Sequence, residues 1–133
     1  MKERNPFEDA PVIFSYTRAQ AIEDGVLVDL TAWAKETGFR IPVACTSTVW
    51  HGHIVPPEGT EGLGQSERGR AHDVLWMLYN GIRGSKHTER EQLLFKVIFL
   101  QKSRKHEEVT LKAICGPGDE GEPVVSIILP RED

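Results

Sequence analysis

The sequence predicts an α+β fold in which an antiparallel meander sheet of three to four strands, mostly C-terminal, is packed on one face by helices from the N-terminal two-thirds. Two patterns carry this prediction. Helix start and stop signals dominate the chain up to residue 84, and three β-forming segments with short connections follow residue 92. Strands joined by such short connections pair in antiparallel fashion. The 133 residues and 39% hydrophobic content suit one domain, 1–133, with one core.

The first elements follow from turn and capping residues. Residues 1–11 are polar, contain two prolines and are expected to form a tail. VIFSY at 12–16 is rich in β-formers and reads as a short strand, which would widen the meander to four strands if it joins the edge. Thr17 is a good N-cap for a helix over 18–24, and Gly25 is the residue type that ends helices.

The next segments are short. VLVDL at 26–30 predicts an extended segment or brief strand, and AWAKET at 32–37 predicts a helix that Thr31 caps. Pro42 suits the first turn of a third helix that reaches about Trp50, although the β-branched run VACTSTV also allows a strand. Residues 51–66 contain four glycines and two prolines and are expected to form a flexible loop that orders on a partner.

The clearest helix follows Ser66 and ends at Asn80-Gly81 or at Gly84. Its apolar residues recur at spacings of three and four and form a broad face, which is typical of a helix packed on a core. The expected members of this face are Val74, Leu75, Trp76, Leu78 and Ile82.

Three β-forming segments follow. LLFKVIFLQ at 93–101 is apolar on both faces except for Lys96, as in an interior strand. VTLKAIC at 109–115 alternates apolar and polar residues, and VVSIIL at 124–129 is apolar. GPGDEGEP between the last two segments is a strong turn signal.

Charge is spread unevenly over a chain of net charge −4. Residues 66–106 carry nine Lys and Arg against four Asp and Glu, while both flanks are acidic. This basic segment predicts an anionic partner, with phosphate contacts as one form of it. The alternative is that the acidic flanks neutralise it within the fold. The residues of the nucleic-acid hypothesis are Arg68, Arg70, Arg83, Lys86, Lys102, Arg104 and Lys105.

Local motifs for metal or nucleophilic chemistry are weak. His51-Gly52-His53 could chelate a metal from an extended segment, but no further ligands accompany it, so we expect no metal and no cofactor. Cys45 and Cys115 belong to no CxxC pair and are expected to be buried structural thiols.

A group of polar and aromatic residues forms a candidate binding set. Two of its members, Asp24 and Asp29, stand beside helix ends, where a carboxylate also satisfies free backbone N–H groups, so a structural role is the alternative. Trp50 and Tyr79 are candidates for stacking or interface anchoring. The binding set comprises Arg18, Asp24, Asp29, Arg40, Trp50, His51 and His53.

Four stretches together resemble a family of small uncharacterised bacterial proteins that are often encoded on plasmids, phages and other mobile elements. The stretches are YTRAQAIEDGVLVDLTAWAKETGFRIPVACT with VIFS before it, VW at 49–50, HDVLWML at 72–78, and LKAICGPGDEGEPVVSIILPRED at 111–133. The resemblance implies an accessory role in a mobile element and supplies no activity. It is carried by Tyr16, Arg18, Gln20, Asp24, Gly25, Asp29, Pro42, Trp50, Asp73, Trp76, Gly116, Pro117 and Asp119.

Three functions follow as hypotheses. The first is a non-enzymatic protein-interaction module that contacts a protein partner through the 51–66 loop. The second is a small enzyme with an Arg/Asp or His-lined pocket, and the third is nucleic-acid binding through residues 68–105. The chain shows no secretory signal and no apolar run near the roughly 18 residues of a membrane span, so we expect a cytoplasmic protein with no membrane partner.

Overall fold

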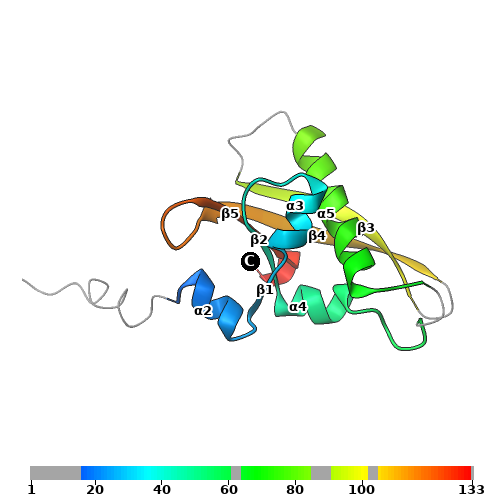
Figure 1. Ribbon diagram of the computed structural model, residues 1–133. Helices are drawn as coiled ribbons and strands as arrows, with labels where there is room; N and C mark the ends of the chain where they lie inside the picture. The colour runs from blue at the N-terminus through cyan, green and yellow to red at the C-terminus, as the bar shows by residue number, and fades with distance from the viewer. Residues whose placement is uncertain (1–15, 61–63, 85–90, 102–104, 133) are drawn as a thin grey trace, which may run out of the picture.

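The computed structural model describes residues 16–60, 64–84, 91–101 and 105–132, and it confirms an α+β architecture (Figure 1). The elements, in chain order, are α2 (Arg18–Glu23), β1 (Leu27–Asp29), α3 (Thr31–Thr37), β2 (Val43–Thr46), α4 (Ser47–Val49), the π-helix η1 (Trp50–Ile54), α5 (Glu67–Gly84), β3 (Gln92–Leu100), β4 (His106–Pro117), β5 (Pro123–Ile128) and the 3-10 helix η4 (Pro130–Glu132).

The sheet has five strands in the order β1-β2-β5-β4-β3. The predicted meander of β3, β4 and β5 is confirmed, because both of its strand pairs are antiparallel. The prediction of three to four purely antiparallel strands is wrong. Strands β1 and β2 extend the sheet, and β2 runs parallel to β5, with Val43 opposite Val125 and Cys45 opposite Ile127.

The missed strand β2 explains this difference. Residues 43–45 are buried on both faces of the sheet, and such a short apolar run has no period that separates a strand from a buried helix. The predicted third helix is therefore reduced to α4, which continues into η1. Residues 12–15 of the expected early strand lie outside the described residues, and Tyr16 precedes α2 without joining the sheet.

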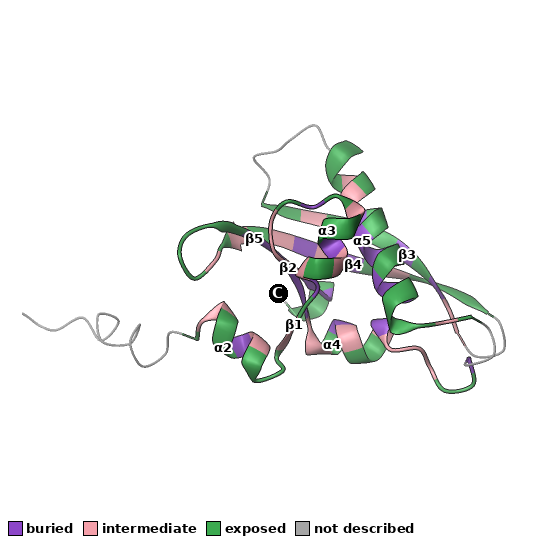
Figure 2. Ribbon diagram, viewed as in Figure 1, coloured by how far each residue is buried: buried purple, intermediate pink, exposed green. Residues whose placement is uncertain are grey.

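Helices α3 and α5 cover one face of the sheet (Figure 1), and the core lies between the two layers. Figure 2 shows the buried residues along the inner sides of α5 and the central strands. The core includes Leu30, Ala34, Val43, Leu75, Leu78, Phe95, Val97, Leu111 and Ile127. No helix in the described parts of the chain is both long and apolar enough to span a bilayer.

The predicted apolar face of α5 is only partly correct. Val74, Leu75 and Leu78 are buried, but Trp76 is 48% exposed and Ile82 is 42% exposed. Trp76 stands two positions from both Val74 and Leu78, and residues two apart on a helix point to different sides. Its side chain therefore lies away from the core.

Helix α5 runs antiparallel to β3 along most of the strand. Near the end of the helix, a Cβ placed on Gly81 would lie 3.3 Å from Cδ2 of Leu93. Near its start, the Arg70 side chain reaches the carbonyl oxygen of Leu100 at the other end of β3. The helix and the edge strand thus form a pair, and the candidate surface is built on this pair.

Candidate interaction surface

A stripe of aromatic and cationic side chains follows one side of α5. Its members recur at spacings of four, four, three and four residues, so they share one side of the helix. We call this set the α5 stripe, and its members are Arg68, His72, Trp76, Tyr79 and Arg83. Tyr79 is half-buried and the other four are exposed.

The rings of the α5 stripe stack in succession. The ring centroids of His72 and Trp76 are 6.3 Å apart with an interplanar angle of 15°, and those of Trp76 and Tyr79 are 6.4 Å apart at 19°. The Arg83 guanidinium lies 5.7 Å from the centre of the Tyr79 ring. Contacts of this kind restrict side-chain rotation, so less entropy is lost when a partner docks.

The stripe continues onto α3 and η1. Arg68 forms a 2.6 Å ion pair with Glu36 and lies 6.0 Å from the centre of the Trp33 ring. Trp33 in turn stacks on Trp50, with 6.3 Å between the ring centroids. A hollow of about 310 Å³ lies here, lined in part by Trp33, Glu36, Arg68 and His72. Trp50, one of the predicted binding residues, therefore adjoins the stripe.

A groove of about 270 Å³ lies between α5 and β3. We call it the β3 edge groove, because β3 is the last strand of the sheet and pairs with β4 alone among the described strands. Its lining residues include Asp73, Trp76 and Met77 from α5, and Lys96, Val97 and Ile98 from β3.

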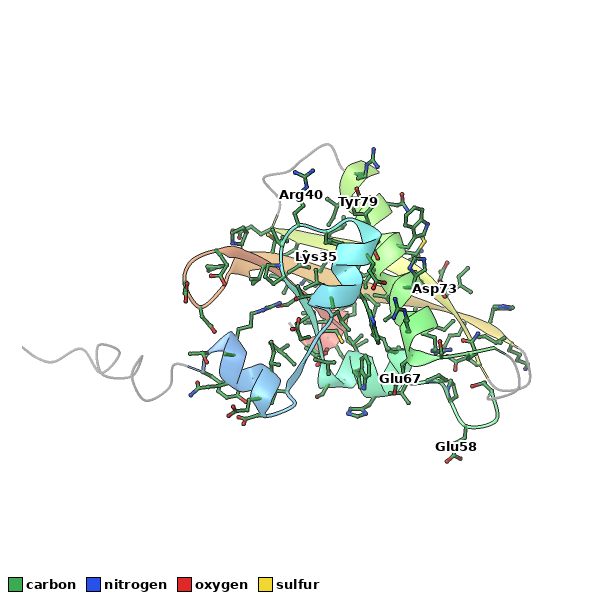
Figure 3. All side chains as sticks on the ribbon, in the orientation of Figure 1. Lys35, Arg40, Glu58, Glu67, Asp73 and Tyr79 are labelled. Carbon is green, nitrogen blue, oxygen red and sulfur yellow. The ribbon has the colours of Figure 1, made fainter. Side chains whose placement is uncertain are left out.

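Charged side chains lie on both walls of the β3 edge groove, on α5 and on β3. Figure 3 shows Asp73 on the side of α5 that faces away from α3. Burial raises the pKa of the Asp73 carboxyl, against the effect of the nearby His72 and Arg70, and no described residue donates a hydrogen bond to it or pairs with it. On the strand, Nζ of Lys96 lies 3.7 Å from Oε1 of Glu108, and both side chains are exposed. Such exposed pairs are weak, so Lys96 can accept another carboxylate.

Arg70 lies beneath this surface and is only 2% exposed. Its Nε donates to the carbonyl oxygen of His53 at 2.7 Å, and its Nη1 donates to Oε1 of Gln65 and to the carbonyl oxygen of Leu100. The guanidinium lies 4.6 Å from the centre of the Phe99 ring. Arg70 therefore joins α5 to η1 and β3, and it is unavailable to a phosphate at the surface.

The other residues of the nucleic-acid hypothesis are dispersed or undescribed. Arg68 and Arg83 belong to the α5 stripe. Lys105 is exposed next to β4, where it lines a different hollow with Pro57. Three further members, Lys86, Lys102 and Arg104, lie outside the described residues.

A separate polar cluster attaches α2 to the sheet. Arg18 donates from Nη1 to Oγ of Ser126 and from Nη2 to the carbonyl oxygen of Val125, both at 2.8 Å. Burial lowers the pKa of this guanidinium, whereas the nearby Asp29 and Asp119 act to raise it. The structure thus brings Arg18 and Asp29 together, but Arg18 is occupied by bonds within the fold.

The remaining predicted carboxylates and Arg40 have other surroundings. Asp29 accepts a hydrogen bond from the backbone N–H of Thr31 at the start of α3. Asp24 caps the end of α2 and accepts a 2.7 Å hydrogen bond from the Tyr16 hydroxyl. Arg40 is exposed in the loop after α3, at the same end of α5 as Tyr79 (Figure 3). No described contact links Arg40 to Arg18 or Asp29.

Asp119 fixes the start of α2 from the β4–β5 turn. Its carboxylate accepts hydrogen bonds from the backbone N–H groups of Arg18 at 2.7 Å and of Ala19 at 3.0 Å. We expect Asp119→Ala to lower the free energy of unfolding by about 1 kcal/mol, as the loss of a helix cap does, and to speed amide exchange in α2. Urea unfolding and hydrogen exchange measure the two effects. Glu120→Ala in the same turn is the control, and an equal loss in both variants would contradict the capping role.

The two histidines of the HGH motif point to different surroundings. They lie two residues apart in the π-helix η1, so they do not form the extended chelating pair considered from the sequence. His51 is exposed, whereas His53 stacks on Phe99 with 5.6 Å between ring centroids. No group of three or more potential metal ligands occurs among the described residues.

The stability of the fold should depend on pH through His53. Burial lowers the pKa of its imidazole below 6.5, and Arg70 and Arg131 act in the same direction, against Glu107. The unfolded chain therefore takes up a proton more readily, so the free energy of unfolding falls as the pH drops below 6.5. We expect His53→Gln to reduce this fall in urea unfolding between pH 7 and pH 5. An unchanged slope in His53→Gln would refute the assignment.

The cysteines differ from each other. Cys45 is buried in β2, and burial raises the pKa of its thiol to about 12, which makes it a poor nucleophile. Cys115 is exposed, so the prediction of a buried thiol is wrong at this position. It lies near the end of β4, where the strand extends past the helix layer (Figure 1).

The first residues of the expected 51–66 loop are helical, which differs from the prediction. Residues 51–54 complete η1, and Ile54 and Thr60 are fully buried. Residues 61–63 lie outside the described residues. The segment therefore contributes to the core as well as to the surface around Trp50.

Compared with known protein families, the chain matches a family of unknown function, DUF6573, over residues 3–133. The chain belongs to this family. No curated protein and no solved structure shows significant similarity to it. The expectation of a family without a known function is confirmed, and membership of DUF6573 assigns no activity to the surface.

Sequence reasoning missed several residues of the surface. The sequence pattern places Trp76 on the core face of the helix and gives no indication that Met77 or Ile98 is exposed. The exposure of Trp76 could have been predicted, because Trp76 does not follow the helical period of the buried Leu75 and Leu78. No comparable signal marked Ile98, because its exposure depends on β3 being an edge strand.

Proposed function

We propose that this chain is a non-enzymatic protein-interaction module whose contact surface comprises the α5 stripe and the β3 edge groove. The gathering of exposed apolar side chains on α5 and β3 supports this proposal most strongly. Among the described residues, these two elements supply most of the exposed large hydrophobic side chains: Trp76, Met77 and Ile98 line the β3 edge groove, and Ile82 and Leu94 lie elsewhere on the same two elements. Exposed aromatic residues and methionine, with arginine beside them, are typical of the centres of protein interfaces.

The surface also has features that favour binding over mere exposure. Its aromatic rings are held by stacking contacts, and a groove beside Trp76 offers a pocket for a partner side chain. Interface anchors cluster around such pockets and exclude water from them. The proposed contact surface thus moves from the 51–66 loop to α5 and β3, with Trp50 at its border.

The enzyme hypothesis finds less support. Arg18 is held by Ser126 and by a backbone carbonyl, and Asp29 bonds the start of α3. His51 and His53 have different surroundings on η1. Arg18 and Asp29 lie near each other, but no contact among the described residues joins them to His51 or His53, whereas a catalytic site requires a base and its partners within hydrogen-bond reach.

Nucleic-acid binding is the second candidate because Arg68 and Arg83 flank the stacked rings of the α5 stripe. Single-stranded nucleic acids bind platforms of aromatic rings and cations. Against this, Arg68 is paired with Glu36, and Asp73 places a carboxylate beside the stack. The charge of the surface is therefore mixed, which favours a protein partner over a polyanion.

The biological setting is part of the proposal. The resemblance described above associates such chains with plasmids, phages and other mobile elements. An accessory role in such an element, exercised in the cytoplasm by contact with a host or element protein, is consistent with a small interaction module. No cofactor enters this function.

Affinity capture from bacterial lysate tests the proposal with three forms of the full chain. The parent should retain a stoichiometric protein partner, and Trp76→Ala should lose it. Val26→Ala is the control, since Val26 is about as exposed as Trp76 but lies between α2 and β1, away from the surface. Equal capture by all three forms would refute the proposed surface. Nucleic acid that is released by salt would favour the second candidate instead.

A further inference from the structure

The β3 edge groove has the architecture of a strand-binding site, with a helix and an edge strand as its walls. Helix α5 runs antiparallel to β3, and the groove lies between them. Among the described residues, β3 forms backbone hydrogen bonds with a neighbouring strand on one side only, and that strand is β4. Alternate backbone N–H and C=O groups of an edge strand point outward and form a template for another strand. An extended segment docked here gains main-chain hydrogen bonds and a pocket at once.

We propose that the β3 edge groove binds an extended segment of a partner protein, which adds to the sheet beside β3 and places apolar side chains beneath Trp76 and Met77. This inference rests on the proposed function and specifies the chemistry of the partner. It requires an exposed anchor on the helix, and both Trp76 (48%) and Met77 (43%) meet that requirement.

The outer face of β3 sets one half of the partner's sequence pattern. Leu94, Lys96 and Ile98 alternate with the buried Phe95, Val97 and Phe99, and Leu94 and Ile98 are 61% and 59% exposed. Directly opposed cross-strand residues interact as pairs. The partner's outward-facing residues are therefore apolar, acidic and apolar in succession, beside Ile98, Lys96 and Leu94.

The inner face sets the other half. Side chains that point into the groove meet Val97, Trp76 and Met77, so they are apolar. Asp73 contributes a carboxylate that accepts no hydrogen bond from a described residue, although the nearby charges of His72 and Arg70 act on it. Along α5, Asp73 lies between Met77, which is near Val97, and Arg70, which is near Phe99. A basic residue therefore fits at the end of the partner segment that lies beside Phe99. The partner segment thus carries one basic and one acidic residue among apolar ones.

A designed peptide tests this pattern on the full chain. In the antiparallel direction the pattern reads Arg-Ile-Val-Glu-Val-Leu, and a fluorescein-labelled peptide of this sequence is titrated by fluorescence anisotropy. Two control peptides carry N-methyl groups on every second backbone amide. One is methylated at the odd-numbered residues and the other at the even-numbered residues, which gives the two possible phases. We expect the parent peptide to bind and one of the two N-methylated peptides to lose binding at least tenfold, because only one phase of amides faces β3.

A charge exchange tests the register. Lys96 is exposed, so Lys96→Glu should fold normally. This variant should bind the peptide about twofold to fivefold more weakly than the parent protein, as expected for one cross-strand charge pair. A peptide with Lys in place of Glu should show the opposite preference.

The outcomes separate this inference from the proposed function. If both N-methylated peptides bind as well as the parent peptide, strand addition is refuted, although side-chain docking on the surface survives. If no peptide binds, the inferred partner chemistry is refuted, and Trp76-dependent capture from lysate still reports on the proposed function. Before the titration, light scattering measures whether the free protein is a monomer or a dimer. A dimer that dissociates on the substitution Lys96→Glu would show that a second copy of the chain, rather than a partner segment, occupies the edge of β3.

Discussion

Arg70→Met should lower the free energy of unfolding by about 1–3 kcal/mol, the range for a buried polar group that loses its hydrogen-bond partner. The substitution keeps a long apolar side chain but removes Nε and Nη1, the two atoms that donate the three hydrogen bonds of Arg70. The carbonyl oxygens of His53 and Leu100 and the amide oxygen of Gln65 then lack this donor. Urea unfolding should show a lower midpoint with an unchanged m-value.

Arg68→Met provides a matched control, because Arg68 lies on the same helix but is exposed. Its only ion pair is with Glu36 among the described residues, and exposed pairs contribute less than about 1 kcal/mol. If Arg70→Met proved as stable as the parent, the cost of burying the guanidinium would outweigh its hydrogen bonds. The role of Arg70 as the link between α5, η1 and β3 would then be wrong.

Trp76→Ala should weaken binding to the captured partner by about 30-fold or more, as truncation of an interface anchor costs at least 2 kcal/mol. The substitution removes the ring that stacks on both His72 and Tyr79 and forms one wall of the β3 edge groove. Because about half of this side chain is exposed, the free energy of unfolding should change little. Isothermal titration calorimetry and urea unfolding measure the two quantities on the same samples.

Val26→Ala serves as the control for this measurement too. It removes an exposed apolar side chain of similar accessibility between α2 and β1. It should leave the dissociation constant unchanged. A similar loss of affinity in both variants would indicate general exposure of apolar surface rather than a defined anchor at Trp76.

The long helix and the last three strands were predictable because each repeats its own pattern over many residues. Leu75 and Leu78 follow the helical period and are buried, and Phe95, Val97 and Phe99 alternate along β3. The α2 start was also predictable, since Thr17 accepts a hydrogen bond from the backbone N–H of Gln20 as a cap does. Local signals sufficed in these segments.

Features set by distant contacts were not predictable. Strand β2 has only four residues, and its parallel partner β5 lies some 80 residues later in the chain, so no local pattern reveals the pairing. Arg70 belonged to the basic segment in sequence, but its burial depends on carbonyl groups of η1 and β3. The candidate surface has the same origin, because Trp76 and Ile98 line one groove only where α5 lies beside the sheet edge.

Hydrogen–deuterium exchange of the full chain, alone and with its captured partner, tests the central proposal most directly. If a partner segment adds to β3 beneath α5, amides of residues 92–100 should become protected on binding, together with those near Trp76. Segments remote from the groove, such as α2, should exchange at the same rate in both samples. Protection confined to α2 or to residues 51–60, with no change in β3, would contradict the account.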